Sequence, residues 1–191
     1  MKVPVEKIRR QQDPFDDCGL YALMNLYVWA GLEPPMLERL KRIAMTSTSG
    51  VTAIDQLRIL VELNFPAILA LGVMTREQNA LDCFPPLIDA GCAVVFGYQH
   101  NYNGWMWGHS VVAESYEGEG ITVLCSSSPK NEGEVVKWID EGPDEDDDPR
   151  LHGNRNIVPW DTIPYTAWSQ RDGQAVGIAR DYVIAYPLSD T

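Results

Sequence analysis

The sequence lacks several features that would point to common functional classes. No segment is long and apolar enough to span a bilayer, and the first residues hold no apolar stretch that could be the core of a signal peptide. Its four cysteines form no CxxC pair, which argues against a zinc site and a dense disulfide framework. We therefore expect a cytoplasmic protein without a metal or cofactor. Export by a route that uses no cleaved signal peptide is the open alternative.

Basic residues are also few relative to acidic ones. Lys and Arg number 15 against 27 Asp and Glu, which gives a formal net charge of −12. Such a charge repels nucleic acid and acidic membrane surfaces, so neither is expected as a partner. The 191 residues suffice for one buried core and are short for two, so residues 1–191 are predicted to form a single domain. The oligomeric state is left open.

Apolar periodicity divides the chain into a helical first part and a strand-rich second part. Helices are predicted at 18–30, at 34–43, after the cap residues Thr52 and Asp55, and at 86–90, with a helical turn at 75–81. Short β-branched or aromatic segments predict strands at 67–71, 92–98, 109–116, 121–125, 135–138, 174–179 and 182–186. Helices followed by strands indicate an α+β fold rather than alternating βαβ units.

An acidic segment, residues 140–148, contains seven acidic residues out of nine. A solvated surface loop is the main expectation for such a charge run. A calcium loop is the sharper alternative, because oxygen-rich segments bind hard cations. The regular ligand spacing and terminal Glu of an EF-hand are absent, however.

Cys18 is the candidate nucleophile. It follows Asp16 and Asp17 and stands where the first long helix should begin, so the helix dipole and unpaired N–H groups would favour its thiolate. Gln12 precedes it by six residues. The loop between them would bring the Gln12 amide beside the thiol, and together with the Cys18 N–H it would form an oxyanion hole. Inert core is the competing interpretation of a cysteine at a helix start.

His109 is the candidate base. It lies between Gly108 and the strand-like run 110–113, and a histidine at a strand start beside a long loop can reach across a cleft. His100 and His152 lie in polar loop sequence and are given no role. Without a cysteine upstream, a structural histidine would be the preferred interpretation of His109 as well.

The other cysteines and two tryptophans are assigned mainly to the core. Cys83, Cys92 and Cys125 are expected to be small buried hydrophobes, although Cys125 could lie close to the site because its strand runs behind His109. Trp105 and Trp107 either form one lip of a cleft or pack on the core.

Taken in order, these residues resemble the papain-like peptidases that cleave double-glycine leaders from bacteriocins, together with their soluble relatives. The shared features are the Gln12-x5-Cys18-Gly19 spacing, the run 87–95, Gly108-His109-x-Val111-Val112 and a later strand that ends before Pro129. The resemblance covers residues 8–186. It implies a papain-like α+β fold in which the N-terminal helical part packs on an antiparallel β-sheet.

The resemblance also implies a reaction. Gln12 would donate to the oxyanion, Cys18 would attack, and His109 would act as general base and then general acid of a peptidase or amidase. The substrate would be a peptide or protein with small residues near the scissile bond. Two alternatives stay open: an acyltransferase or transglutaminase-like enzyme with the same Cys–His pair, and a catalytically inactive peptide-binding module.

One departure from the family concerns the group that orients the histidine. The family usually has Asp or Asn directly before the Pro, whereas this chain has Ser128 before Pro129. A serine can accept a hydrogen bond from the imidazole but supplies no negative charge to the imidazolium. Asn131 or an acid from residues 140–148 are the possible substitutes, so the third member of the triad is left open.

Overall fold

The computed structural model describes residues 2–11, 17–44, 51–75, 78, 80–102, 105–126, 137–140, 153–160, 168–171, 174–177 and 181–187. The helices are η1 (Val5–Lys7), α1 (Cys18–Trp29), α2 (Leu37–Ala44), α3 (Ala53–Glu62) and α4 (Ala80–Asp89). The strands are β1 (Ile68–Val73), β2 (Ala93–Tyr102), β3 (Trp105–Glu117), β4 (Gly120–Cys125), β5 (Lys137–Asp140), β6 (Asn154–Pro159), β7 (Trp168–Arg171), β8 (Gln174–Gly177) and β9 (Asp181–Tyr186).

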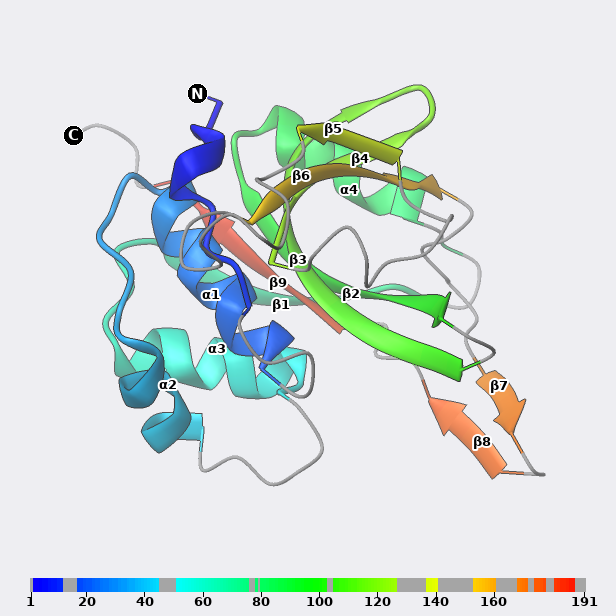
Figure 1. The fold of residues 1–191 in the computed structure, drawn as a ribbon, viewed down its shortest axis with the longest axis horizontal. Helices are drawn as coiled ribbons and strands as arrows, with labels where there is room; N and C mark the ends of the chain where they lie inside the picture. Colours follow the sequence, from blue (N-terminus) through cyan, green and yellow to red (C-terminus); the bar gives the residue numbers. More distant parts are fainter. Residues whose placement is uncertain are drawn as a thin grey trace, which may run out of the picture.

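Seven of these strands form one antiparallel sheet in the order β1-β9-β2-β3-β4-β6-β5, and β7 and β8 form a separate antiparallel pair. Figure 1 shows α1, α2 and α3 gathered on one side of the large sheet and α4 on the other. The α+β class is therefore confirmed. In the described part of the chain, no helix combines the length and the apolar character needed to cross a membrane.

Each face of the sheet carries its own apolar cluster. The helix-side cluster joins α1, α2 and α3 to the sheet; its strand members are Ala93, Val95, Val112, Leu124, Val183 and Ala185. The α4-side cluster joins α4 to the opposite face; its strand members include Val94, Phe96, Tyr98, Val111, Ala113, Val123 and Cys125. Because side chains alternate along a strand, neighbouring residues of β2, β3 and β4 belong to different clusters.

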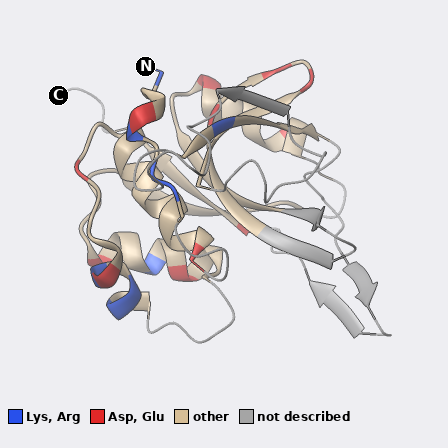
Figure 2. Cartoon of the chain, viewed as in Figure 1, with Lys and Arg blue, Asp and Glu red and all other residues tan. Residues whose placement is uncertain are grey.

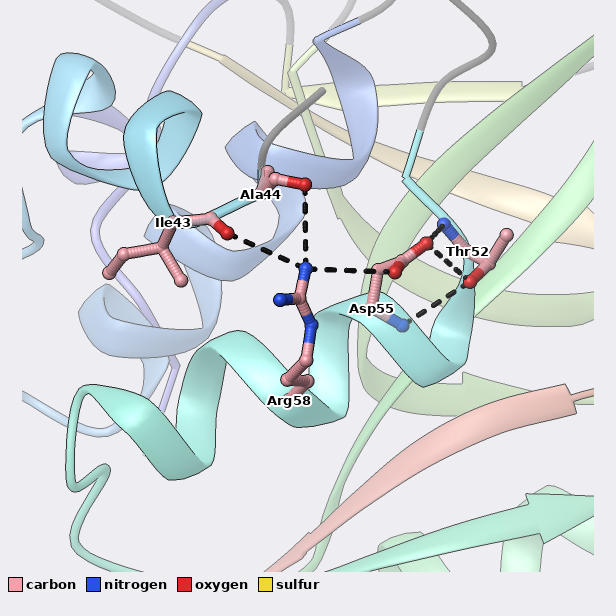
Figure 3. A network of polar contacts seen from close by, with 5 residues as sticks. All are labelled: Ile43, Ala44, Thr52, Asp55 and Arg58. Atoms are coloured by element: carbon pink, nitrogen blue, oxygen red, sulfur yellow. Dashed lines mark hydrogen bonds and ion pairs between the residues drawn. The ribbon is translucent and has the colours of Figure 1, made fainter. Parts of the chain in front are cut away.

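The predicted cap of α3 is confirmed. The Thr52 hydroxyl accepts a hydrogen bond from the Asp55 N–H at 3.2 Å, and the Asp55 carboxylate accepts one from the Thr52 N–H at 3.2 Å. Figure 3 shows how Arg58, one turn later, reaches from α3 to the last carbonyl groups of α2, those of Ile43 and Ala44. The same group of side chains thus begins one helix and ends another.

Two predictions about elements differ from the structure. The helix predicted at 86–90 begins earlier, because α4 starts at Ala80 and continues through Pro85 and Pro86. Burial of Phe84 in the α4-side cluster offsets the backbone bonds that the prolines remove. The strand predicted from residue 109 begins at Trp105 instead, because β2 and β3 form one long hairpin.

Strand β6 was not predicted at all. It is nevertheless an interior strand that pairs with β4 and β5, and its polar sequence hides its burial. Its residue Arg155 is buried because Glu114 lies against it, with 2.6 Å between Arg155 Nε and Glu114 Oε2. Pattern analysis cannot find a strand whose buried side chains are paired ions and amides.

Candidate functional site

Cys18 is the first residue of α1, as predicted. Asp17 is the N-cap residue, and its carbonyl accepts hydrogen bonds from the N–H groups of Leu20 and Tyr21 at 2.9 and 3.0 Å. Leu20 and Leu23 are fully buried in the helix-side cluster, so the start of the helix is firmly held. The Cys18 side chain is half-buried, which leaves part of it accessible to solvent. A partly exposed thiol at a helix N-terminus is a suitable nucleophile.

The side chain of Gln56 joins the start of α1 to β3. From α3, its Nε2 donates to the Gly19 carbonyl at 3.0 Å and to the Ser110 hydroxyl at 3.0 Å. Gly19 directly follows Cys18, and Ser110 directly follows His109. One buried amide therefore ties together the two short segments that carry the predicted nucleophile and base.

His109 is the fifth residue of β3 and is buried, with 6% of its surface exposed. Its Nε2 lies 3.2 Å from Sγ of Cys125, at the end of β4. The Tyr98 ring, from the paired position on β2, meets the imidazole edge to face with ring centroids 5.6 Å apart. The ring is thus held by a sulfur on one neighbouring strand and an aromatic on the other.

The pleat of β3 turns His109 and Ser110 in opposite directions. Ser110 contacts Gln56 on α3, whereas His109 contacts Tyr98 and Cys125, which belong to the α4-side cluster. Cys18 begins a helix that packs on the other face. The predicted Cys18–His109 pair thus has neighbouring backbones, while the imidazole contacts a different thiol.

A third segment, residues 2–11, reaches the same region and is called the N-terminal arm. It runs past α1 (Figure 1) and is held by buried groups. The Asn25 side chain accepts from the Arg9 N–H at 2.7 Å and donates to the Arg9 carbonyl at 3.4 Å. At the end of the arm, the Gln11 N–H donates to the Ser126 carbonyl at 2.8 Å, one residue beyond Cys125. Gln12 itself lies outside the described residues.

A lysine balances the acidic residue beside the thiol. Lys41 Nζ lies 2.6 Å from Oδ2 of Asp17, and this hydrogen bond raises the pKa of Lys41. Lys41 belongs to α2, whose ribbon in Figure 2 carries both acidic and basic positions. A carboxylate next to Cys18 would oppose a thiolate there, and the ammonium group offsets that repulsion.

Two of the remaining cysteines are poor candidates for a nucleophile. Burial raises the pKa of the Cys92 thiol. Burial also raises that of Cys83, with a further increase from the nearby Asp82 carboxylate. A raised thiol pKa leaves less thiolate at neutral pH, so both should react slowly. Cys125 is fully buried, and a substrate carbonyl could not reach its sulfur without opening the sheet.

Several predicted residues fall outside the described part of the chain. They include Ser128, Asn131, His152 and residues 141–148; of the acidic segment only Asp140 is described, as the last residue of β5. Trp105 and Trp107 lie on β3 instead of in the predicted loop. Among the described residues, no group of three or more His, Cys, Asp or Glu side chains is placed to hold a metal ion.

Sequence reasoning missed Gln56, although a signal for it exists. Gln56 shares the buried face of α3 with Ala53 and Leu60, at spacings of three and four residues. A polar side chain at a core-facing position of a helix needs a hydrogen-bond partner, which marks it as a contact between segments.

The chain matches no protein-family model and no curated protein sequence. The resemblance to papain-like peptidases therefore rests on the residues themselves.

Proposed function

We propose that this protein is a papain-like cysteine peptidase or amidase that acts on a peptide or protein substrate. The observation that carries the proposal is the Gln56 clamp. Its amide bonds to Gly19 and Ser110, and so brings the segment that carries the half-buried Cys18 thiol against the segment that carries His109. A nucleophile and a base must be held together by rigid elements, and here each stands on one.

The proposed reaction follows from these groups. His109 Nδ1 takes the proton of Cys18, and the thiolate attacks the carbonyl carbon so that a C–S bond forms. The imidazolium then gives that proton to the leaving amine as the C–N bond breaks. Water, deprotonated by the same imidazole, attacks the thioester and releases the acid, which restores the Cys18 thiol. Gln12 and the helix-start N–H groups would stabilise the oxyanion.

The first test is the pH dependence of iodoacetamide labelling, followed for each cysteine by peptide mass spectrometry. Wild type is compared with Cys18→Ser and His109→Ala. We expect Cys18 to be labelled first. The inflection of its pH profile should lie well below the pKa of an ordinary thiol, which is about 8.5. The inflection should disappear in His109→Ala.

Cys83 and Cys92 serve as internal controls in every sample. Both thiols have a pKa raised by burial and should be labelled slowly in all three proteins. If Cys18 reacts no faster than Cys83, or if His109→Ala leaves its profile unchanged, the catalytic proposal is wrong.

A second candidate function, a catalytically inactive peptide-binding module, is favoured by one specific observation. The His109 ring is buried and contacts Cys125 and Tyr98 in the α4-side cluster, whereas α1 packs on the other face of the sheet. A histidine held there would stabilise the sheet rather than serve Cys18. Slow, unselective labelling of all four cysteines would support this function.

A further inference from the structure

The described structure offers a candidate for the group that orients His109. Nε2 of His109 lies 3.2 Å from Sγ of Cys125, and both side chains are buried. We propose, on the basis of the proposed function, that Cys125 is the positioning residue of the catalytic histidine. Its sulfur accepts the Nε2–H, so that the lone pair of the neutral imidazole stands on Nδ1. The sequence leaves the residue that orients His109 open between Ser128, Asn131 and an acidic residue. The proposal assigns this role to the Cys125 thiol instead.

The sheet fixes this sulfur firmly. Cys125 ends β4, an interior strand that pairs with β3 on one side and β6 on the other, where Cys125 stands opposite Asn154. Its side chain shares the α4-side cluster with Val111 and Val123. A sulfur held by two neighbouring strands can fix the plane and the tautomer of a ring, which is what an orienting residue does.

Tyr98 restrains the same ring from the other neighbour, β2. Its edge-to-face contact with the imidazole has an interplanar angle of 87°. With Nε2 directed at Cys125, Nδ1 is the nitrogen with which His109 can serve Cys18. Nδ1 is bonded to Cγ and so lies nearer the β3 backbone, which the Gln56 clamp joins to the start of α1.

A thiol in this role has a distinct chemical consequence. Sulfur is a weak hydrogen-bond acceptor and, as a neutral thiol, gives no charge to stabilise an imidazolium. The titratable groups that contact the ring include the Tyr98 phenol on β2 and the Cys125 thiol on β4. The site should therefore hold the correct tautomer, but lose base strength relative to one with a carboxylate.

The test compares Cys125→Ala and Cys125→Asn with the matched control Cys92→Ala. Cys92 is a second buried cysteine of the α4-side cluster, so its replacement leaves a cavity of the same size. Two readouts are taken: the pH profile of Cys18 labelling, and the ¹⁵N signals of the His109 ring. Circular dichroism establishes that each variant is folded.

We expect Cys125→Ala to slow the labelling of Cys18 at neutral pH about tenfold, because the ring loses its tautomer preference. The ¹⁵N signals should then show more protonation at Nδ1. Cys125→Asn, whose amide oxygen accepts the Nε2–H, should restore the profile, and Cys92→Ala should leave it as in wild type.

The inference is overturned if folded Cys125→Ala keeps the wild-type profile and ¹⁵N signals, or if Cys92→Ala has the same effect as Cys125→Ala. Failure of the proposed function looks different: Cys18 labelling in the wild type is then already independent of His109. In that case, even if the His109 tautomer depends on Cys125, the contact between His109 and Cys125 is only structural. That result also overturns the positioning role.

Discussion

Lys41 Nζ lies 2.6 Å from Oδ2 of Asp17, the residue directly before the candidate nucleophile Cys18. The hydrogen bond raises the pKa of Lys41, so the lysine stays charged throughout the neutral range. Helix α2 thus supplies a cation at the start of α1. This contact makes the reactivity of Cys18 depend on a residue that need not touch a substrate.

Replacing Lys41 by Met should lower the labelling rate of Cys18 near neutral pH. The Asp17 carboxylate would then face the thiolate without its counter-charge. A partly exposed ion pair is worth at most about 1 kcal/mol, so the loss should not exceed about fivefold. Lys41→Arg, which keeps the charge, is the control, and added salt should reduce the difference between wild type and Lys41→Met. Equal rates for wild type and Lys41→Met at low salt would contradict this role of the pair.

The stability that the same pair contributes should be lost at alkaline pH. The folded-state pKa of Lys41 lies above its ordinary value of 10.5, so the folded state binds the proton more tightly than the unfolded state. The stabilisation is therefore fully present below pH 10.5 and is lost as the pH rises through the folded-state pKa. Urea unfolding of wild type and Lys41→Met should show a small difference at pH 8 that disappears in strong alkali. A difference that grows with pH would be inconsistent with the raised pKa.

Gln56→Leu should reduce both stability and site reactivity. Leucine keeps the volume but leaves the Gly19 carbonyl and Ser110 hydroxyl without this donor, which should cost about 2 kcal/mol of unfolding free energy. Ser110→Ala removes only one of the two bonds and should cost about 1 kcal/mol. Cys18 labelling should fall further in Gln56→Leu than in Ser110→Ala. A Gln56→Leu protein with wild-type stability would show that the two Gln56 hydrogen bonds contribute nothing to the unfolding free energy.

Sequence patterns predict the helices and strands whose buried side chains are apolar. The start of α1 and the Thr52–Asp55 cap agree with the structure. Apolar periodicity and cap chemistry are local, so they can be found in one sequence. Strand β6 and the helical course through Pro85 are set by contacts with distant segments, and no local pattern encodes them.

The candidate site shows the same division. Cys18 and His109 could be selected because a helix-start cysteine and a histidine next to an apolar run are local features. The contact between His109 and Cys125 depends on the register of β3 against β4, which a sequence does not display. The sequence predicts Cys125 as a small buried hydrophobe that could lie close to the site; its 3.2 Å contact with the ring is found only in the structure.

Gly19→Ala should destabilise the protein although alanine favours helices. A Cβ at residue 19 would lie 2.9 Å from Val51 Cβ and 3.1 Å from the Val51 carbonyl oxygen. The propensity gain of alanine is about 1 kcal/mol at most, whereas overpacking a close contact costs about 1 to 3 kcal/mol. We expect a net loss of about 1 kcal/mol by urea unfolding. Gly118→Ala is the control, because a Cβ there meets no atom within 4 Å. A Gly19→Ala protein more stable than wild type would show that the Val51 segment yields.

Glu114 and Arg155 form a buried pair that also fixes the N-terminal arm. The Glu114 carboxylate accepts from Arg155 Nε at 2.6 Å and from the Val3 N–H at 2.7 Å, while Arg155 Nη2 donates to the Val3 carbonyl. Glu114→Leu would leave a buried guanidinium uncompensated, so we expect a loss of about 3 to 5 kcal/mol.

The double variant Glu114→Leu with Arg155→Met separates the effect of the buried charge on stability from the anchoring of the N-terminal arm at Val3. It removes both ions together, so it should recover most of the stability that Glu114→Leu loses. It should not recover the anchor of the arm, because neither new side chain bonds to Val3. If the arm places Gln12 at the site, the double variant should unfold near the wild-type urea midpoint and yet be acylated slowly at Cys18 by a peptide substrate, since Gln12 would stabilise the oxyanion. A double variant as reactive as wild type would show that the contacts of Arg9 and Gln11 hold the arm without Val3.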